Sequence, residues 1–229
     1  DFTINAVAQS VTGQFYDPSN GLQDIKNKIL RSPRNQSGKR FEEDPVRIMR
    51  AARFMGNYKL KVHSSVAKGI KKHGDKLKGM PKARIGRELA KIMQSDKPAT
   101  ALEFMEEYKL LDAIDPAVAK MVDYKQNTPH HKWNLWKHTM SSLKKADSDD
   151  MILNLAIFLH DIGKPDAADT AQSTFHGHEK HSAKHAASIL KRLEFSDDHV
   201  KRVENLVAMH MRLLTIPEDS SSGAFRRIK

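Results

Sequence analysis

Apolar residues at helical spacing fill the chain after about residue 30, and this spacing constrains the fold more than any other feature. In EEDPVRIMRAARFMGNY, Val46, Met49 and Ala52 recur at intervals that place them on one face of a helix. KARIGRELAKIMQ, PATALEFMEEYKLLDAI and the segments around WNLWKHTMSSL, DMILNLAIFLH, GHEKHSAKHAASILKRL and DDHVKRVENLVAMHM repeat the pattern. Before residue 30, alternation around Phe15 between turn-forming segments predicts a β-hairpin. The sequence therefore predicts a mainly α protein with a small β element at its N-terminus.

The chain divides into three parts by composition. Residues 1–30 carry the expected hairpin, residues 31–125 form a first helical region, and residues 126–229 form a second one. The polar, proline-containing stretch YKQNTPHHKW places the last boundary near Gln126.

Charge and cysteine content limit the classes of partner and site. The net charge is +11, with 39 Lys and Arg against 28 Asp and Glu, which favours a polyanionic partner such as nucleic acid. Because the chain has no cysteine, any metal site must use histidines and carboxylates. The sequence shows no secretory segment and no long apolar span, so a soluble protein of the cytoplasm is expected.

The strongest chemical signal lies in LNLAIFLHDIGKP. An almost uniformly apolar helix ends there in His160 and Asp161, and an adjacent imidazole and carboxylate are costly to bury unless something pairs them. A metal ion would satisfy both groups. His138 in LWKHTM could supply a further ligand, as could His176 or His178 in FHGHE, and a set of His and Asp ligands suits Mn, Fe, Ni, Zn or Mg.

Together, His138, the apolar helix with its HD pair and the later HGHE resemble the HD superfamily of metal-dependent phosphohydrolases, whose signature is H…HD…D. The resemblance implies that His138, His160 and Asp161 bind a divalent metal such as Mn²⁺, Ni²⁺ or Mg²⁺, with His178 as a fourth ligand in an H…HD…H variant. Lys164 would contact phosphate or lie in solvent.

One position departs from that signature. The last aspartate of the HD pattern should follow one or two helices later, where the chain offers His210 and Asp219, and neither lies clearly at the expected place. Phosphohydrolase activity therefore stays open, whereas the HD fold does not. The remaining histidines are expected on solvated surface (His181, His185, His199) or at a helix cap or pocket rim (His130, His131).

The segment FEEDPVRIMRAARF carries a second candidate site. Asp44, Arg47 and Arg50 are spaced by three residues, which predicts adjoining turns of one helix face. Such a set is either a surface ladder of ion pairs or a pair of hydrogen-bonding edges that can read a nucleobase, since a carboxylate accepts and a guanidinium donates in parallel.

Four segments, in order, resemble class II tRNA nucleotidyltransferases, which are the CCA-adding enzymes, and the related bacterial poly(A) polymerases. These segments are DFTINAVA, DPSNGLQDIKNKILR, FEEDPVRIMRAARF and ARIGRELAKIM with ALEFMEEYKLLDAIDP. EDPVR resembles the family's EDxxR motif. By resemblance, Asp44 and Arg47 read the base of incoming CTP or ATP, Arg50 contacts the nucleotide, tRNA is the partner, and one branch of the family carries a C-terminal HD domain.

The resemblance also assigns supporting roles. Asp1 and Asn5 would support the edge of the active site, whereas Arg53 and Phe54 would pack inside the helical region. The stretch from Lys59 to Lys91 is rich in Lys and Arg, with only Asp75 and Glu88 opposing them. It is either a solvated face or a track for the acceptor arm of tRNA, where neutralised phosphates supply affinity independent of sequence.

The family's catalytic carboxylates are not identified in this chain. DFTINA resembles the family's RRDFTINA motif without its arginines, and no DxD pair or Gly-rich phosphate segment precedes it. The pairs Asp149-Asp150 and Asp197-Asp198 stand at helix starts, where capping explains them. We therefore expect the Mg²⁺ site of the transferase head to lie outside this chain, which alone would not add nucleotides. Two alternatives remain: a separate HD phosphohydrolase with an RNA-binding module, and a non-catalytic RNA-binding module. The oligomeric state stays open.

Overall fold

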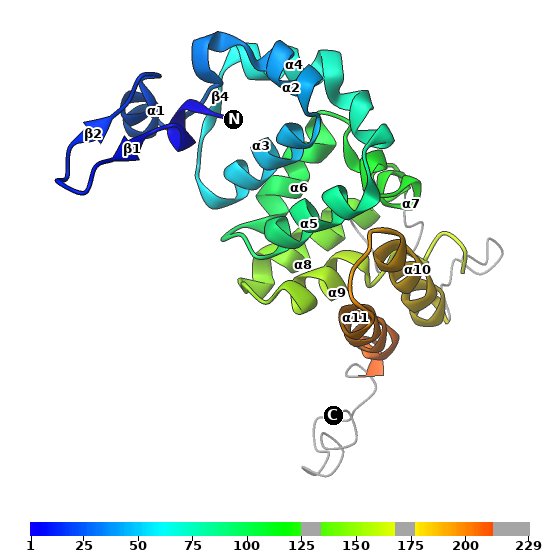
Figure 1. The fold of residues 1–229 in the computed structure, drawn as a ribbon. Helices are drawn as coiled ribbons and strands as arrows, with labels where there is room; N and C mark the ends of the chain where they lie inside the picture. The colour runs from blue at the N-terminus through cyan, green and yellow to red at the C-terminus, as the bar shows by residue number, and fades with distance from the viewer. Residues whose placement is uncertain (125–133, 168–176, 213–229) are drawn as a thin grey trace. The chain divides into compact units, whose positions relative to one another are not determined.

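A computed structural model describes residues 1–124, 134–167 and 177–212 (Figure 1). It divides into two compact units, residues 1–119 (unit 1) and residues 120–229 (unit 2). The described chain is mainly helical with two small sheets, which confirms the predicted fold class. The boundary expected at Gln126 lies outside the described residues.

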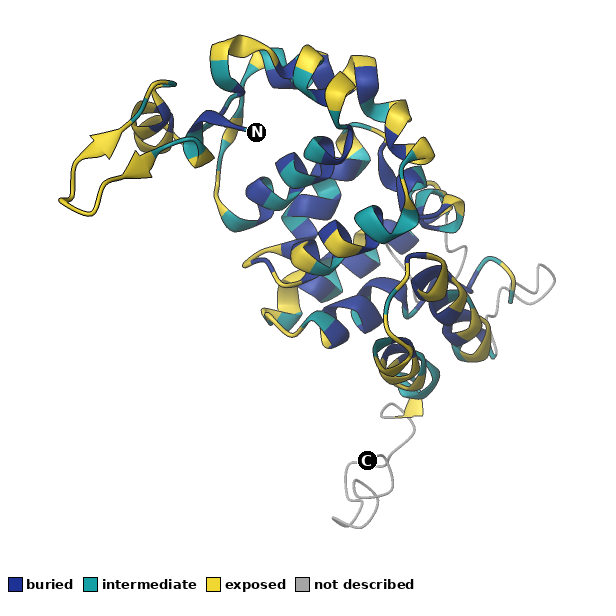
Figure 2. Cartoon of the chain, in the orientation of Figure 1, coloured by how far each residue is buried: buried dark blue, intermediate teal, exposed yellow. Residues whose placement is uncertain are grey.

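The N-terminal part of unit 1 contains all of the described β-structure. The predicted hairpin is present: β1 (Ala8–Gln9) pairs antiparallel with β2 (Phe15–Tyr16), and Figure 2 shows both strands exposed. After α1 (Gly21–Asn27), the short strand β3 (Ile29–Leu30) pairs in parallel with β4 (Lys61–Val62). The sequence did not predict this second pair, because two-residue strands show no usable alternation.

Unit 1 is otherwise helical. Its α-helices are α2 (Ser37–Glu43), α3 (Val46–Asn57), α4 (Ser64–His73), α5 (Lys82–Met93), α6 (Pro98–Glu107) and α7 (Pro116–Lys120), the last of which reaches into unit 2. Short 3-10 helices are η1 (Thr3–Asn5), η2 (Pro33–Asn35), η3 (Gly74–Gly79) and η4 (Leu111–Ala113).

Helix α3 forms the centre of unit 1, packed against α5 and α6 (Figure 1). Val46, Met49 and Ala52 are buried on its inner face, as the helical spacing predicted, and Ile48 is also completely buried. Gly56 permits the close approach near the end of α3, because a Cβ there would lie 2.7 Å from the hydroxyl oxygen of Ser95. This packing fixes the first turns of α3, which carry two of the predicted nucleotide-binding residues.

Unit 2 is built from α8 (Leu135–Ala146), α9 (Met151–Leu159), α10 (His178–Arg192) and α11 (Asp197–Met209). Helix α9 packs against the other three, which explains why its sequence is apolar on nearly every side. The Asp150 carboxylate caps α9 by accepting hydrogen bonds from the backbone N–H groups of Ile152 (2.7 Å) and Leu153 (3.1 Å). In α11 the cap is Ser196, and Asp197 and Asp198 occupy the first turn instead.

A glycine holds the turn after α9 tightly against α10. The backbone N–H of Gly163 donates to the buried hydroxyl of Ser182 at 3.0 Å. A Cβ at Gly163 would lie 2.4 Å from the backbone nitrogen of Ser182, a distance that no packed side chain tolerates. The contact fixes the position of the HD pair relative to α10.

The described helices are all too short or too polar to cross a membrane.

Candidate functional site

The buried carboxylate of Asp161 is the centre of the candidate metal site in unit 2. It follows the C-cap of α9 and is 2% exposed, so a charged group lies in the interior at the end of an apolar helix. Four imidazoles from four helix segments face it. The Nε2 atoms of His138 (3.5 Å) and His160 (3.1 Å) approach its Oδ2, and those of His178 (3.1 Å) and His210 (3.7 Å) approach its Oδ1.

Two of these imidazoles are oriented by the helices that they terminate. His160 is the C-cap of α9 and donates from Nδ1–H to the carbonyl of Ile157 at 2.7 Å. His210 is the C-cap of α11 and donates in the same way to Val207, also at 2.7 Å. A carbonyl only accepts, so Nδ1 carries the proton in both rings. In this orientation the Nε2 atom of each ring faces the cluster, and the neutral form of such a ring presents its lone pair there, as in protein metal sites.

The imidazoles come in two close pairs. The Nε2 atoms of His138 and His160 lie 3.2 Å apart, and those of His178 and His210 also lie 3.2 Å apart. Ligand nitrogens bound at about 2.0–2.1 Å to one ion have separations of this size. A proton shared within a pair also allows the distance, but a cation serves both nitrogens and the carboxylate at once.

The charge state of Asp161 suits a cation as partner. Burial on its own raises the pKa of this carboxyl, but the imidazoles of His160 and His178 and the ammonium of Lys164 outweigh burial and hold the pKa far below its usual range. Lys164 lies 2.7 Å from Oδ2 and is 4% exposed, so the expectation that it lies in solvent is wrong. Burial lowers the pKa of His210, which keeps its ring neutral.

The ligand atoms form two groups that share Asp161. One group is His138, His160 and Asp161, the other is Asp161, His178 and His210, and within each group all ligand atoms lie within 4.8 Å of one another. Oδ2 of Asp161 is buried among nitrogen atoms, with the Lys164 ammonium at 2.7 Å and the imidazoles of His160 at 3.1 Å and His138 at 3.5 Å. The residues present therefore fit a divalent metal ion held by nitrogen and oxygen.

The structure thus brings together all four residues predicted as metal ligands, His138, His160, Asp161 and His178. It adds His210, which the sequence offered without a clear place in the HD pattern. The spacing of residues along the chain did not predict that His210 joins the cluster, because its approach depends on how α11 packs against α9 and α10. The alternatives His176 and Asp219, and also His130 and His131, lie outside the described residues.

The histidines expected on solvated surface differ in their surroundings. His181 is exposed, His199 is half-buried beside the ring of Phe195, and His185 forms an ion pair with Asp166. None of the three belongs to a metal-ligand group in the described part of the chain.

The predicted nucleotide-reading residues of unit 1 lie where α2 meets α3. Arg47 and Arg50 are on α3, but Asp44 precedes that helix as the C-cap of α2, with an extended backbone. The expectation of three residues on one helix face is therefore wrong for Asp44. Pro45 explains the break, because a proline disfavours helical geometry at the residue before it.

Ion pairs hold each of these side chains. Arg47 Nε lies 3.1 Å from one oxygen of Asp1, and Arg50 lies 2.6 Å from the other. The carboxylate of Asp44 accepts from the backbone N–H of Val46 at 3.2 Å and from Arg84 of α5 at 2.8 Å. The cluster is partly exposed and internally neutralised, so it presents oriented donors and acceptors without requiring an added ion.

Neighbouring charged residues follow the packing that was expected of them. Arg53 donates to the buried Glu88 at 3.2 Å and lies over the ring of Phe54, 5.1 Å from its centroid. Several cations of the Lys59–Lys91 stretch are exposed (Lys59, Lys61, Lys68, Lys71, Lys72 and Arg87). Others are paired, such as Lys76 with Glu42 and Lys78 with Asp112.

Two family models match the chain. One is described as "Probable RNA and SrmB- binding site of polymerase A" and covers residues 59–121, a range that includes the basic stretch. The other is the HD domain, which covers residues 128–225 and therefore all five residues around the candidate metal centre. The chain therefore consists of a helical region that matches a probable RNA-binding model, followed by a region that matches the HD domain.

Curated relatives match nearly the whole chain. An A-adding tRNA nucleotidyltransferase of Deinococcus radiodurans is 30% identical over 97% of this chain and 53% of that protein. A multifunctional CCA protein of Tolumonas auensis is 28% identical over 86% of this chain and 49% of that protein. The chain spans about half the length of these relatives. Over nearly its whole length the chain is therefore similar to an A-adding tRNA nucleotidyltransferase and to multifunctional CCA proteins.

Solved structures share the fold. A tRNA-processing enzyme complex matches with a TM-score of 0.65 at 24% identity, over 100% of this chain and 58% of that one. The CCA-adding enzyme of Thermotoga maritima, solved in complex with tRNA, matches with a TM-score of 0.55 at 17% identity, over 100% of this chain and 54% of that one.

Proposed function

We propose that the chain serves tRNA nucleotidyl transfer, the addition of CCA or of A alone to the 3′ end of tRNA from CTP and ATP. Unit 1 holds the acceptor arm and reads the incoming base, and the Mg²⁺-dependent transfer step takes place in a catalytic head of the kind found in its relatives. The observation that carries this proposal is the match of residues 59–121 to an RNA-binding family model, next to the Asp44–Arg47 cluster. A tRNA substrate implies a cytoplasmic protein.

The chemistry of the cluster supports base reading. The Asp44 carboxylate is oriented by Arg84 and Val46 and can accept from the amino group of cytosine or adenine. Arg47 can donate to the ring nitrogen or carbonyl of the same base, while Asp1 and Glu43 hold its guanidinium. Arg50, which is 34% exposed at its side chain, can reach the sugar or phosphates.

Salt-dependent tRNA binding by this chain tests the RNA-binding part. Lys68, Lys71 and Lys72 are exposed on α4, and replacing all three by Ala should reduce the slope of log K against log salt by up to about 3, since each phosphate contact contributes about 0.9. Lys180→Ala with Lys184→Ala on α10 is the matched control, because both lysines are exposed outside the basic stretch. A tRNA affinity that does not change with salt concentration would reject the proposal that the Lys59–Lys91 stretch holds the acceptor arm.

Base selection tests the reading part. In an enzyme that joins this chain to a nucleotidyl-transfer head, Asp44→Ala or Arg47→Ala should abolish discrimination of CTP and ATP from UTP and GTP. Arg87→Ala, an exposed arginine of α5, should leave discrimination intact. Unchanged selectivity in both cluster variants would remove the assignment of Asp44 and Arg47.

A second function, hydrolysis of a phosphoester at the HD site, is favoured by the five converging ligands of unit 2. A bound Mn²⁺, Ni²⁺ or Mg²⁺ would supply Lewis-acid chemistry and activate water. His138, His160, Asp161, His178 and His210 would hold it. Lys164 adds positive charge beside the carboxylate, where it can favour a phosphate oxygen.

Phosphate-ester hydrolysis of 2′,3′-cyclic nucleotides tests this second function. The chain should open the cyclic ester only with divalent metal present, and His160→Ala should abolish the activity. His181→Ala, which removes an exposed imidazole outside the cluster, is the control. Activity that survives His160→Ala would reject the proposed metal site.

A further inference from the structure

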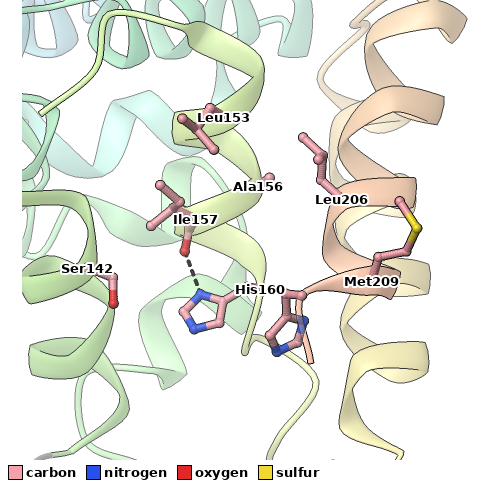
Figure 3. Close-up of a pocket in the computed structure, with 8 residues that line it drawn as sticks. Ser142, Leu153, Ala156, Ile157, His160, Leu206 and Met209 are labelled. Carbon is pink, nitrogen blue, oxygen red and sulfur yellow. Dashed lines mark hydrogen bonds between the residues drawn. The ribbon is translucent and has the colours of Figure 1, made fainter. Parts of the chain in front are cut away.

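The two units contain pockets of opposite character. The pocket of unit 2 adjoins the candidate metal centre and is part of that site, and its lining includes no Asp, Glu, Lys or Arg (Figure 3). The pocket of unit 1 lies where α4 and α6 both end, and it is rich in charged residues. Its volume is about 300 Å³, at the small end of the range for small-molecule sites. This α4–α6 pocket is lined by Ile70, Lys71, Gly74, Asp75, Glu107, Tyr108, Lys109 and Leu110.

The buried part of the α4–α6 pocket is apolar. Ile70, on the last turn of α4, is 1% exposed, and Leu110, which follows α6, is 4% exposed. Gly74 lets the two segments approach, because a Cβ there would lie 2.8 Å from Cδ2 of Leu110. Tyr108 is half-buried, and its ring packs on that of Phe104 with the two centroids 4.9 Å apart. The pocket therefore offers a flat ligand an aromatic partner and apolar contacts.

Four exposed charged residues complete the lining. Lys71 and Lys109 contribute ammonium groups. Asp75 and Glu107 contribute carboxylates. Within the part of the chain that the structure describes, none of the four forms an ion pair, whereas two nearby lysines of η3 are paired. The ammonium groups only donate hydrogen bonds and the carboxylates only accept them. A ligand that satisfies both kinds of group must bring a negative charge together with N–H or O–H donors.

One residue belongs both to this pocket and to the exposed lysines of α4. Lys68, Lys71 and Lys72 are exposed on that helix, and Lys71 also lines the pocket. Because Lys68 and Lys71 are three residues apart, they are neighbours on one helix face. An RNA strand whose phosphates follow these lysines therefore passes beside the pocket. The net charge of +11 and the match of residues 59–121 to a probable RNA-binding model both favour RNA as the occupant.

We propose that the α4–α6 pocket takes one unpaired nucleobase of the bound RNA, with the flanking phosphates at Lys71 and Lys109. Tyr108 stacks on the base, as aromatic side chains do when proteins bind single strands. The carboxylates of Asp75 and Glu107 accept from the amino group of cytosine, adenine or guanine, which uracil lacks. The inference rests on the proposed RNA binding by unit 1, and it adds a contact that depends on the base to contacts that do not.

RNA hexamers that differ at one base test the pocket. By fluorescence anisotropy, the full chain should bind UUCUUU about 10-fold more tightly than UUUUUU, because a correct base contact discriminates by roughly that factor. Tyr108→Ala should reduce this preference to less than about 2-fold, since the base loses its stacking partner. Tyr58→Ala is the matched control and should keep the preference. Tyr58 is the C-cap of α3 and stacks on Phe54, just as Tyr108 is the C-cap of α6 and packs on Phe104.

Two further variants test the charged groups. Asp75→Ala with Glu107→Ala should abolish the preference for UUCUUU, and Asp96→Ala, which removes an exposed carboxylate elsewhere in unit 1, should not. Lys109→Gly should keep the wild-type melting temperature, because the φ of +57° at Lys109 suits glycine. It should nevertheless reduce the slope of log K against log salt by about 0.7 for both hexamers, the contribution of one phosphate contact on a single strand.

A second readout does not depend on the lysines of α4. Cytidine 5′-monophosphate, titrated into the full chain, should shift the methyl NMR signals of Ile70 and Leu110, and Tyr108→Ala should weaken this binding. If neither hexamer binds, the proposed RNA binding by unit 1 fails, while the methyl shifts still decide whether the pocket takes a base. Equal affinities for the two hexamers in the wild-type chain would overturn the pocket assignment. So would methyl shifts with N-acetyltyrosine amide but not with the nucleotide, because a protein side chain would then be the occupant.

Discussion

The charged clusters of the two units are neutralised in opposite ways. In unit 1, every charged side chain of the nucleotide-reading cluster is matched by one of opposite sign: Asp1 by Arg47 and Arg50, and Asp44 by Arg84. In unit 2, one carboxylate that is 2% exposed faces four imidazoles, two of which present lone pairs. The first cluster is complete without an ion, and the second has the composition of a cation site.

This difference determines how much free energy the loss of one charged group costs in each unit. Partly exposed ion pairs are worth about 0–1 kcal/mol each, so removing one costs little, and the cluster of unit 1 acts by orientation. Buried charges cost several kcal/mol unless paired, so removing one partner of the buried Asp161–Lys164 pair in unit 2 costs much more. Perturbing the two clusters in turn should therefore give effects of very different size.

The largest effect is expected for Asp161→Asn. This change removes the oxygen charge shared by both ligand groups, so affinity for a divalent cation should fall by more than about 100-fold. It also leaves the buried ammonium of Lys164 without this carboxylate, which should lower the free energy of unfolding by about 3 kcal/mol. Metal analysis after dialysis and urea unfolding measure the two effects.

Asp198→Asn provides the control for that change, because Asp198 is 75% exposed at its side chain on α11. It should alter neither metal content nor unfolding. If the Asp161→Asn variant retained a bound cation, the conclusion that the two clusters differ in their need for a cation would be wrong.

A somewhat smaller effect is expected for Gly163→Ala. The added methyl would press on the backbone of α10 at Ser182, which cannot move aside, so the free energy of unfolding should fall by about 1–3 kcal/mol. Gly79→Ala in η3 is the matched control, since no heavy atom lies within 4 Å of the added Cβ. Thermal unfolding of both variants measures the difference, and equal melting temperatures would show that α10 does not clamp the HD turn.

Lowering the pH should lower the free energy of unfolding of metal-free unit 2. Burial lowers the pKa of His210 below its ordinary 6.5, so below that pH the unfolded chain binds a proton that the folded chain does not, and stability falls as pH falls. His210→Gln should flatten this part of the stability–pH curve, and His181→Gln should not. Urea unfolding of the chelated chain between pH 7 and pH 5 measures the slope; a steeper slope in His210→Gln would contradict the cause assigned.

The smallest effect is expected in unit 1. Arg84→Ala removes an ion pair whose partners are 38% and 25% exposed at their side chains, so the free energy of unfolding should change by less than about 1 kcal/mol. Selection of the incoming base should nevertheless weaken, because the Asp44 carboxylate loses its orientation. A loss of several kcal/mol would mean that the unit 1 cluster is structural rather than a reader of bases.

Much of this organisation could be predicted from residues close in sequence. The helical spacing around Met49 and the capping carboxylate of Asp150 are local features, and both are present as predicted. His160 and Asp161 stand out because an imidazole and a carboxylate follow a run of apolar residues. Each of these signals lies within a few turns of one helix.

Most features that the sequence did not predict depend on contacts between segments far apart along the chain. The parallel pairing of Ile29 with Lys61 joins residues far apart along the chain, and His210 joins the cluster only because α11 packs against α9. Asp44 was misplaced for a local reason, since Pro45 disfavours helical geometry at the residue before it and Asp44 is the extended C-cap of α2. For Lys164 the sequence left phosphate contact and solvent exposure as alternatives, because spacing does not show that its ammonium lies 2.7 Å from Asp161.

The C-cap histidines give unit 2 a mechanical property. His160 and His210 each donate to the carbonyl three residues earlier, so displacing either ring breaks a hydrogen bond to the last turn of α9 or α11. In the proposed metal-bound form, a cation at this centre would therefore also stabilise these two helix ends, which are usually the first parts of a helix to open.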